Sequence, residues 1–428
     1  MKNRNLGPAL FLIGIGLVLM LLSVLSGCAP DAPVKPDPAP SAVPAETVTP
    51  QPTAAPVPTP DPTPSPGQRA KERLMQMTTP EKVGQLLTVG VEGTIPGRDA
   101  MSYIQTYQVG GVILFSRNVE SADQLLTMTN GLKYLNQEEG NVPLLISADE
   151  EGGTVSRMPP EVAVLPDALT SVELGIDSAD RGAALAACCK AFGIGMNYAP
   201  VLDIWSNPGN TVIGHRAFGT DPYTVNREGQ RCMEAMMEGG VIPVIKHFPG
   251  HGDTIVDSHV GLPRIAKDLE VLEACEFIPF RTAITTGAPA VMVGHLAITW
   301  MDQTYPASLS PAAVTQLLRE EMGFDGVVVT DDLTMGAITQ YWTVGEAAVK
   351  AVQAGCDQLL VCHGRENVDA AREGLLNAVQ NGTITEERLN ESVLRILTMK
   401  ETWNVSDDPI SGVDIEALNA SIAPALIR

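Results

Sequence analysis

Short apolar runs recur along the chain from about residue 83, and each is followed by a longer segment whose apolar residues have helical spacing. Within the runs the residues are apolar almost without interruption and often β-branched, which is typical of strands buried on both faces of a parallel sheet. The predicted strands are "VGQLLTVGVE" from 83, "GGVILF" from 110, "PLLISAD" from 143, "MNYAPVLDI" from 196, "VIPVIK" from 241, "AVMVGHLAI" from 290, "GVVVTDD" from 326 and "QLLVC" from 358.

The segments between these runs predict helices, among them "ADRGAALAACCKAFG", "TVNREGQRCMEAMMEGG" and "PAAVTQLLREEMG". They end at Gly193, Gly239 and Gly323, and glycine is the residue that most often ends a helix. Strands that alternate with helices in this way indicate an α/β protein with a single, closed (β/α)8 barrel of the TIM type. An open, doubly wound sheet is the alternative, weakened because no GxGxxG fingerprint follows the first strand.

The first residues differ from this pattern. Lys2 and Arg4 precede an apolar run from Ala9 to Leu25, and "LSGC" follows it. These are the parts of a secretory signal, and "LSGC" resembles a bacterial lipobox, so we interpret residues 1–28 as a lipoprotein signal peptide with Cys28 as the lipidated residue. An uncleaved transmembrane anchor is the alternative, because the run is nearly of spanning length. Either interpretation places the rest of the chain outside the membrane, and we expect the protein to be exported and anchored to the outer face of the cell membrane.

Residues 29–67 are dense in proline with alanine and threonine, and they contain almost no large apolar side chains. Such a segment cannot bury a core, and we predict a disordered, semi-rigid linker. Residues 68–428 are then the catalytic domain. The formal net charge of −22, without a basic stripe, argues against nucleic acid as a partner. Apart from Cys28, the cysteines show no zinc-like spacing, and we expect buried free thiols.

Polar residues gather where the predicted strands end. All 6 histidines lie at a strand end or in the loop that follows one, as do several aspartates and arginines. In a parallel barrel the carboxyl ends of the strands meet at one face, so we expect these side chains to converge there. They are His215, His247, His251, His259, His295, His363, Asp149, Asp203, Asp331, Asp332, Arg157 and Arg216.

The densest stretch is "KHFPGHGDTIVDSH", residues 246–259. His247, His251 and His259 could ligate zinc with Asp253 or Asp257, although no HExxH motif or cysteine pair accompanies them. The other interpretation is a retaining glycosidase. Asp257 would orient His259 as an acid and base, and a carboxylate from the end of another strand would attack the sugar.

This stretch and "LLREEMGFDGVVVTDDLTM" (317–335) resemble family 3 of the glycoside hydrolases, in particular its β-N-acetylglucosaminidase branch. The resemblance extends from about 70 to 405 and includes "ADEEGGTVSR", "APVLDI", "VIGHRAFGTDP" and "RLNESVLRILTMK". It implies Asp331 as the nucleophile and His259 with Asp257 as the acid/base dyad. It implies contacts to the terminal sugar from the side chains of Lys246, His247, Asp149, Arg157 and Arg216.

Asp332 is the alternative nucleophile on proximity alone, although the family pattern favours Asp331. His295 and Asp203 stay outside the implied set, as structural hydrogen-bonding residues at the mouth of the barrel. The chain departs from the family pattern at Ala217, where serine is usual, and at Thr154, where arginine is common. These departures leave the aglycone less certain than the terminal sugar.

The resemblance implies a retaining exo-β-N-acetylglucosaminidase that acts on muropeptides from peptidoglycan or on chitooligosaccharides, with no metal and no cofactor. A phosphorylase of the same family and a non-catalytic, sugar-binding lipoprotein are the alternatives. We expect N-acetylglucosamine-containing oligosaccharides and the membrane as partners, and a monomer.

Overall fold

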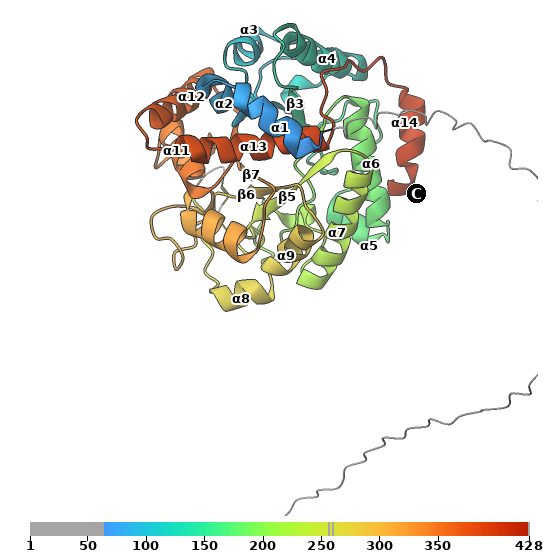
Figure 1. Ribbon diagram of the computed structural model, residues 1–428. Coiled ribbons are helices and arrows are strands. Elements are labelled where there is room, and N and C mark those ends of the chain that lie inside the picture. The colour runs from blue at the N-terminus through green and yellow to red at the C-terminus, as the bar shows by residue number, and fades with distance from the viewer. Residues whose placement is uncertain (1–63, 256, 259–260, 427–428) are drawn as a thin grey trace, which may run out of the picture. The chain divides into compact units, whose positions relative to one another are not determined.

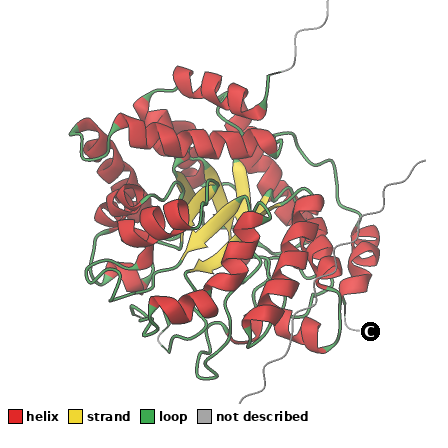
Figure 2. Cartoon of the chain, turned by 60° about the horizontal axis from the view of Figure 1, so that its bottom comes forward, coloured by secondary structure: helices red, strands yellow, loops and turns green. Residues whose placement is uncertain are grey.

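The computed structural model describes residues 64–255, 257–258 and 261–426. The predictions for the signal peptide, Cys28, the linker up to residue 63 and the side chain of His259 therefore fall outside the described residues. Parallel strands form an 8-stranded sheet in the order β7-β6-β5-β4-β3-β2-β1-β8. A parallel bridge between Val329 and Gln358 joins its two outer strands. The sheet is thus a nearly closed barrel, and helices surround it (Figure 2), which confirms the predicted (β/α)8 fold.

The strands are β1 (Leu87–Gly90), β2 (Gly111–Leu114), β3 (Leu145–Ala148), β4 (Met196–Asn197), β5 (Ile242–Phe248), β6 (Ala290–Val293), β7 (Val327–Thr330) and β8 (Leu359–Val361). The α-helices are α1 (Pro66–Gln76), α2 (Thr79–Gln85), α3 (Arg98–Met101), α4 (Ala122–Glu138), α5 (Ala168–Glu173), α6 (Ser178–Ala191), α7 (Pro222–Glu238), α8 (Leu269–Ala274), α9 (Phe277–Thr285), α10 (Gly336–Thr339), α11 (Val344–Ala354), α12 (Arg365–Gln380), α13 (Glu386–Thr402) and α14 (Ile415–Ile422). Segments η1 (Ser102–Thr106) and η5 (Ala312–Glu321) are π-helical, and η2 (Ser116–Asn118), η3 (Gly214–Arg216), η4 (Ala307–Leu309) and η6 (Ala423–Ala425) are 3-10 turns. In the part of the chain described here, no helix has both the length and the apolar character needed to cross a membrane.

Every predicted apolar run contains a strand, and the strands are buried on both faces as their continuous hydrophobicity predicts. The fourth run forms the shortest strand because Pro200 has no N–H to donate to the ladder. The chain nevertheless continues beside β5, since the Leu202 N–H donates to the Lys246 carbonyl at 2.7 Å. Asp203 is thereby placed next to the carboxyl end of β5.

The predicted helix ends are confirmed at Gly193 and Gly323, which have φ values of 71° and 72°. At the third, Gly239 is the C-terminal cap with φ −69°, and the left-handed residue is the next one, Gly240, with φ 78°. The cysteines of the described region are free thiols, and all but the partly exposed Cys275 are buried.

The amino-terminal end of the barrel is closed by α13. Ile396 and Met399 pack into the barrel interior, and the buried Lys400 ammonium donates to the carbonyls of Gly110 and Pro143, just ahead of β2 and β3, at 2.8 Å each. Helix α1 lies along α13 (Figure 1), and Arg69 pairs with Glu401 at 2.6 Å. The described chain therefore begins at the closed end of the barrel.

Candidate active site

A cavity of about 360 Å³ opens at the carboxyl ends of the strands. Most of the residues that the family resemblance singles out line it, and they come from the loops after β3 and β4, from β5 and from the end of β7. They are Asp149, Arg157, Arg216, Lys246, His247 and Asp331, joined by Glu151, His251, Ser258, Asp332, Cys362 and His363. The structure thus brings together side chains that are far apart in the sequence.

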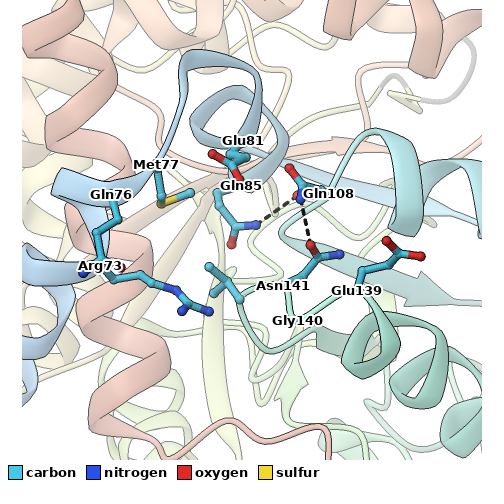
Figure 3. A pocket seen from close by; sticks show the side chains of 10 residues that line it. Arg73, Gln76, Met77, Glu81, Gln85, Gln108, Glu139, Gly140 and Asn141 are labelled. Atoms are coloured by element: carbon cyan, nitrogen blue, oxygen red, sulfur yellow. Dashed lines mark hydrogen bonds between the residues drawn. The ribbon is translucent and has the colours of Figure 1, made fainter.

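A second, smaller cavity of about 200 Å³ lies near the closed end (Figure 3). Its polar groups bond one another: Gln85 Nε2 donates to the backbone carbonyl of Gln108 at 2.9 Å, and Gln108 Nε2 donates to Asn141 Oδ1 at 2.8 Å. None of the candidate residues from the sequence lines this cavity. The chemistry is therefore concentrated at the opposite, open end.

The loop after β3 turns sharply so that its side chains reach the cavity. Gly152 and Gly153 have φ values of 76° and 59°, which only glycine adopts readily, and an antiparallel bridge joins Gly152 to Val155. A Cβ atom on Gly153 would approach the Asp167 side chain to 2.7 Å. The "EEGG" sequence is therefore a tight turn that places Arg157 back beside the strand end.

Lys246 and Arg216 are joined by carboxylates of this loop. Lys246 Nζ lies 2.7 Å from Asp149 Oδ1 and 2.6 Å from Glu151 Oε1. Arg216 donates from Nε and Nη2 to the two Glu151 oxygens, at 2.8 Å each. Burial alone would raise the pKa of Glu151, but Arg216 and Lys246 outweigh it and hold this pKa well below its usual value. Glu151, which sequence reasoning missed, is thus the anionic centre of the network.

Arg157 stands on the same loop with unused hydrogen-bonding capacity. Its backbone N–H donates to Glu150 Oε2 at 2.6 Å, and Nη1 donates to the Ser156 carbonyl at 3.0 Å. Among the described residues, its buried Nε has no hydrogen-bond partner. An unsatisfied buried donor is costly, which suits a group that awaits a ligand.

Asp331 and Asp332 follow β7, and their carboxylates have different surroundings. Asp332 Oδ1 accepts from the N–H groups of Thr334 and Cys362 at 3.0 Å each, and its Oδ2 accepts from the Thr334 hydroxyl at 2.5 Å. Asp331 Oδ1 accepts from the Asp332 N–H at 2.8 Å, and its side chain is partly exposed on the cavity wall. Burial would raise the pKa of Asp331, but His295 and His247 overcome this and lower it, so the carboxylate is ionised.

Asp203, fully buried at the end of the fourth run, holds two histidines. His247 Nδ1 lies 2.6 Å from Asp203 Oδ2, and the His251 backbone N–H donates to Asp203 Oδ1 at 2.6 Å. Because Asp203 engages Nδ1, the Nε2 edge of the His247 ring stays available to the cavity, which His247 lines. His295 is also fully buried and bonds Ser308 and the Asp332 carbonyl, so it supports the end of β7.

Of the two remaining described histidines, His363 lines the cavity and His215 does not. His363 is about half exposed and lines the cavity, with its ring 5.4 Å from that of Phe115. His215 is more exposed and lies 3.7 Å from Asp167. Asp257 is partly exposed in the loop after β5, and its partner in the predicted dyad, His259, lies outside the described residues.

The two departures from the family pattern do not reach the cavity. Ala217 is fully buried in a small cluster with Val201 and Ile213. Thr154 is exposed at the tip of the turn after β3.

The metal interpretation finds no support among the described side chains. In that part of the chain, no group of three or more His, Cys, Asp or Glu is placed to hold a metal ion. Asp203 occupies Nδ1 of His247, and hydroxyl groups of Thr254 and Ser258 occupy both ring nitrogens of His251.

Known proteins resemble this chain in sequence and structure. A family model described as "Glycosyl hydrolase family 3 N terminal domain" matches residues 78–399. Beta-hexosaminidase LpqI of Mycobacterium tuberculosis is 37% identical over 334 residues, which is 75% of this chain and 82% of that protein. Beta-hexosaminidase A of Pseudoalteromonas piscicida is 33% identical over 324 residues, 69% of this chain, and the chain spans only 54% of its length.

Among solved structures, a glycoside hydrolase family 3 β-N-acetylglucosaminidase from Paenibacillus sp. str. FPU-7 is 40% identical to this chain, with a TM-score of 0.76. The match covers 82% of this chain and 68% of that one.

Proposed function

The chain belongs to glycoside hydrolase family 3, and from this premise we propose that it is a retaining exo-β-N-acetylglucosaminidase. It removes terminal β-linked N-acetylglucosamine from peptidoglycan fragments or chitooligosaccharides. The observation that carries the proposal is the Asp331 carboxylate, which is ionised and lines the cavity. The carboxylate of the adjacent Asp332 is instead engaged by hydrogen bonds from two backbone N–H groups. The similar proteins named as β-hexosaminidases and the β-N-acetylglucosaminidase structure support the choice of sugar.

In the first step, an Asp331 oxygen attacks the anomeric carbon and forms a covalent glycosyl ester. The bond from that carbon to the leaving oxygen breaks, and the leaving oxygen takes a proton from His259. Asp257 favours the protonated imidazole by accepting a hydrogen bond from it. Asp331 serves as nucleophile because its carboxylate is ionised and is less engaged than that of Asp332.

In the second step, water attacks the anomeric carbon from the side that the leaving group occupied. His259 takes the proton of the water, and the ester bond to Asp331 breaks. Two displacements at one carbon restore the β configuration, so the sugar is released with retention.

The network around Lys246 binds the sugar. Asp149 holds Lys246 through Oδ1, and a carboxylate retains further lone pairs for sugar hydroxyls. Arg157 offers Nε, which has no hydrogen-bond partner in the described part of the chain. Arg216 has N–H donors beyond those that Glu151 and the Val212 carbonyl accept. His247, held by Asp203, adds a ring nitrogen beside the nucleophile.

Product analysis tests the reaction and its stereochemistry. We expect the fragment from Pro64 onward, which keeps α1 and its N-cap Ser65 intact, to release N-acetylglucosamine from chitobiose and from disaccharide muropeptides, and proton NMR should show the β anomer first. Initial release of the α anomer would contradict the retaining mechanism. The ratio of kcat/KM for the two substrates identifies the preferred aglycone.

The same assay separates the alternatives. A phosphorylase would release N-acetylglucosamine 1-phosphate when phosphate is added, whereas a hydrolase releases the free sugar regardless. A sugar-binding lipoprotein would bind chitobiose without turnover. The ionised Asp331 favours an enzyme, since binding alone needs no nucleophile.

We also propose that Cys28 carries the lipid that anchors the protein to the outer face of the cell membrane. The support is the "LSGC" sequence after the apolar run, followed by the proline-rich segment 29–67. We expect the enzyme to act as a monomer.

A further inference from the structure

His251 occupies a fixed position at the base of the loop after β5. It is 2% exposed, and its backbone N–H donates to Asp203 Oδ1 at 2.6 Å. The glycines on either side permit this close packing: a Cβ atom on Gly252 would lie 1.8 Å from the Ile204 carbonyl oxygen, and one on Gly250 would lie 2.7 Å from the Glu276 side chain. The backbone of His251 is therefore locked against the loop after β4.

The imidazole of His251 bonds the loop on both sides of Asp257. Nδ1 lies 2.7 Å from the Thr254 hydroxyl, and Nε2 lies 3.3 Å from the Ser258 hydroxyl. Both hydroxyls belong to buried residues. Because Thr254 precedes Asp257 and Ser258 follows it directly, one ring fixes the loop at two points that flank the carboxylate.

The same loop is held from the other direction by the backbone of α10. The Ala337 N–H donates to the Ser258 carbonyl at 3.0 Å, and α10 begins five residues after the proposed nucleophile, Asp331. Ser258 thus connects His251, which Asp203 holds, with the segment that follows β7. Any shift of Ser258 changes the distance between Asp257 and Asp331.

A neutral imidazole matches these partners. Burial and the nearby His247 lower the pKa of His251, with Asp203 and Asp331 acting in the opposite direction. A neutral ring has one donor and one acceptor nitrogen, and each hydroxyl serves as either donor or acceptor. Both ring nitrogens are engaged by the loop, so the ring acts through the loop.

We propose that His251 is a positioning residue that sets the place of the acid/base loop, and hence of Asp257, relative to Asp331. This inference rests on the proposed function, in which Asp257 and His259 form the proton-transferring dyad. A displaced dyad impairs proton transfer to the leaving oxygen while leaving the nucleophile intact. The loss therefore depends on how much the leaving group needs a proton.

The test compares kcat/KM for chitobiose with that for a 2,4-dinitrophenyl N-acetylglucosaminide, whose leaving group needs no acid. We expect His251→Ala to lose roughly 10- to 100-fold on chitobiose and to stay within about threefold on the aryl substrate in the glycosylation step. His251→Asn, which retains a polar group near the Nδ1 position, should recover part of the chitobiose rate. Equal losses on both substrates would overturn the proposal.

Two matched variants keep the test valid if His251→Ala folds poorly. Thr254→Val and Ser258→Ala each delete one hydroxyl partner and leave the imidazole in place, and each should reproduce part of the selective loss on chitobiose. If neither changes the ratio of the two rates, the loop is not held through these bonds and the proposal fails.

Asp257→Asn and His259→Ala distinguish this inference from the proposed function. If both lack leaving-group selectivity, the dyad assignment is wrong and the positioning role falls with it. If both show the selectivity and the His251, Thr254 and Ser258 variants do not, only the positioning role of His251 is overturned.

Discussion

Glu151 and Arg216 form a bidentate ion pair at the wall of the cavity, with both N–O distances at 2.8 Å, although 65 residues separate them in the sequence. The same carboxylate lies 2.6 Å from Lys246. Glu151→Gln would leave Arg216 without a charged partner in a buried site. Breaking a buried pair in this way costs about 3–5 kcal/mol. We expect a large fall in the midpoint of urea unfolding and a raised KM for chitobiose.

Glu321→Gln is the matched control, because it removes the carboxylate from an exposed pair with Arg281 at 3.0 Å. Exposed pairs contribute little to stability, so this variant should resemble the wild type in both measurements. Equal behaviour of the two variants would contradict a special role for the Glu151 network.

The adjacent aspartates after β7 should differ sharply when replaced. Asp331→Asn removes the proposed nucleophile, and we expect turnover of every substrate to fall by roughly 10⁴-fold or more. Asp332→Asn disturbs the hydrogen bonds from Thr334 and Cys362, so it should lower the unfolding temperature. It should retain most of the wild-type activity. Rates and thermal unfolding of both variants check this. A fully active Asp331→Asn protein would show that another residue is the nucleophile.

Glu150, between Asp149 and Glu151 in the loop after β3, predicts a pH effect on stability. Burial raises the pKa of Glu150 from 4.5 to about 7, against hydrogen bonds from the Arg157 N–H and the Ser156 hydroxyl. Between these two pKa values the folded chain binds more protons than the unfolded chain, so this group makes the free energy of unfolding decrease as pH rises from about 4.5 to 7.

Glu150→Gln removes this titration. The difference between the unfolding free energies of the variant and the wild type should therefore shift in favour of the variant as pH rises through that range, by at most a few kcal/mol, since one pKa unit corresponds to about 1.4 kcal/mol. Urea unfolding at intervals of pH measures the difference. A difference that stays constant from pH 4.5 to 8 would show that Glu150 ionises normally.

The two steps of the proposed reaction should separate in His259→Ala. With an activated aryl substrate the first step needs little acid, whereas the second still needs a base, so the glycosyl ester on Asp331 should accumulate. Intact-protein mass spectrometry would detect one added N-acetylhexosamine residue. Azide needs no deprotonation and should restore turnover with formation of the β-glycosyl azide. Without accumulation or rescue, His259 is not the acid/base.

Anchoring should depend on a single thiol. We expect Cys28→Ala to abolish metabolic labelling with a radioactive fatty acid, while the activity of the released protein stays unchanged because the cavity lies in the other part of the chain. Cys275→Ala is the control and should label normally. Persistent labelling of Cys28→Ala would refute the lipobox interpretation.

The barrel was predictable because each strand is a nearly continuous apolar run, which requires burial on both faces whatever the partner. Local sequence also located the segment 311–323, but there the pattern predicts an α-helix and η5 is π-helical. The difference in hydrogen-bond register changes the apolar spacing too little to be seen in one sequence. Likewise the position of Gly239 marked the helix end, whereas the left-handed residue is Gly240.

The candidate site was predictable to the extent that polar residues follow strands. Asp149 and Asp331 directly follow strands, and Lys246 lies near the carboxyl end of β5. Barrel geometry brings such positions together. Glu151 escaped because its importance comes from Arg216, a partner distant in sequence. Adjacent acidic residues look equivalent until their separate partners are known.

The closure of the barrel by α13 has a practical consequence for how the enzyme can be attached to anything else. Helix α1 begins at Pro66 beside this closed end, and the cavity opens at the opposite ends of the strands. A lipid, an affinity tag or a solid support joined ahead of Pro66 is therefore attached at the closed end of the barrel, away from the cavity. The proline-rich residues 29–65 precede this point in the sequence. Immobilisation through this segment should leave the opening accessible even to a long glycan.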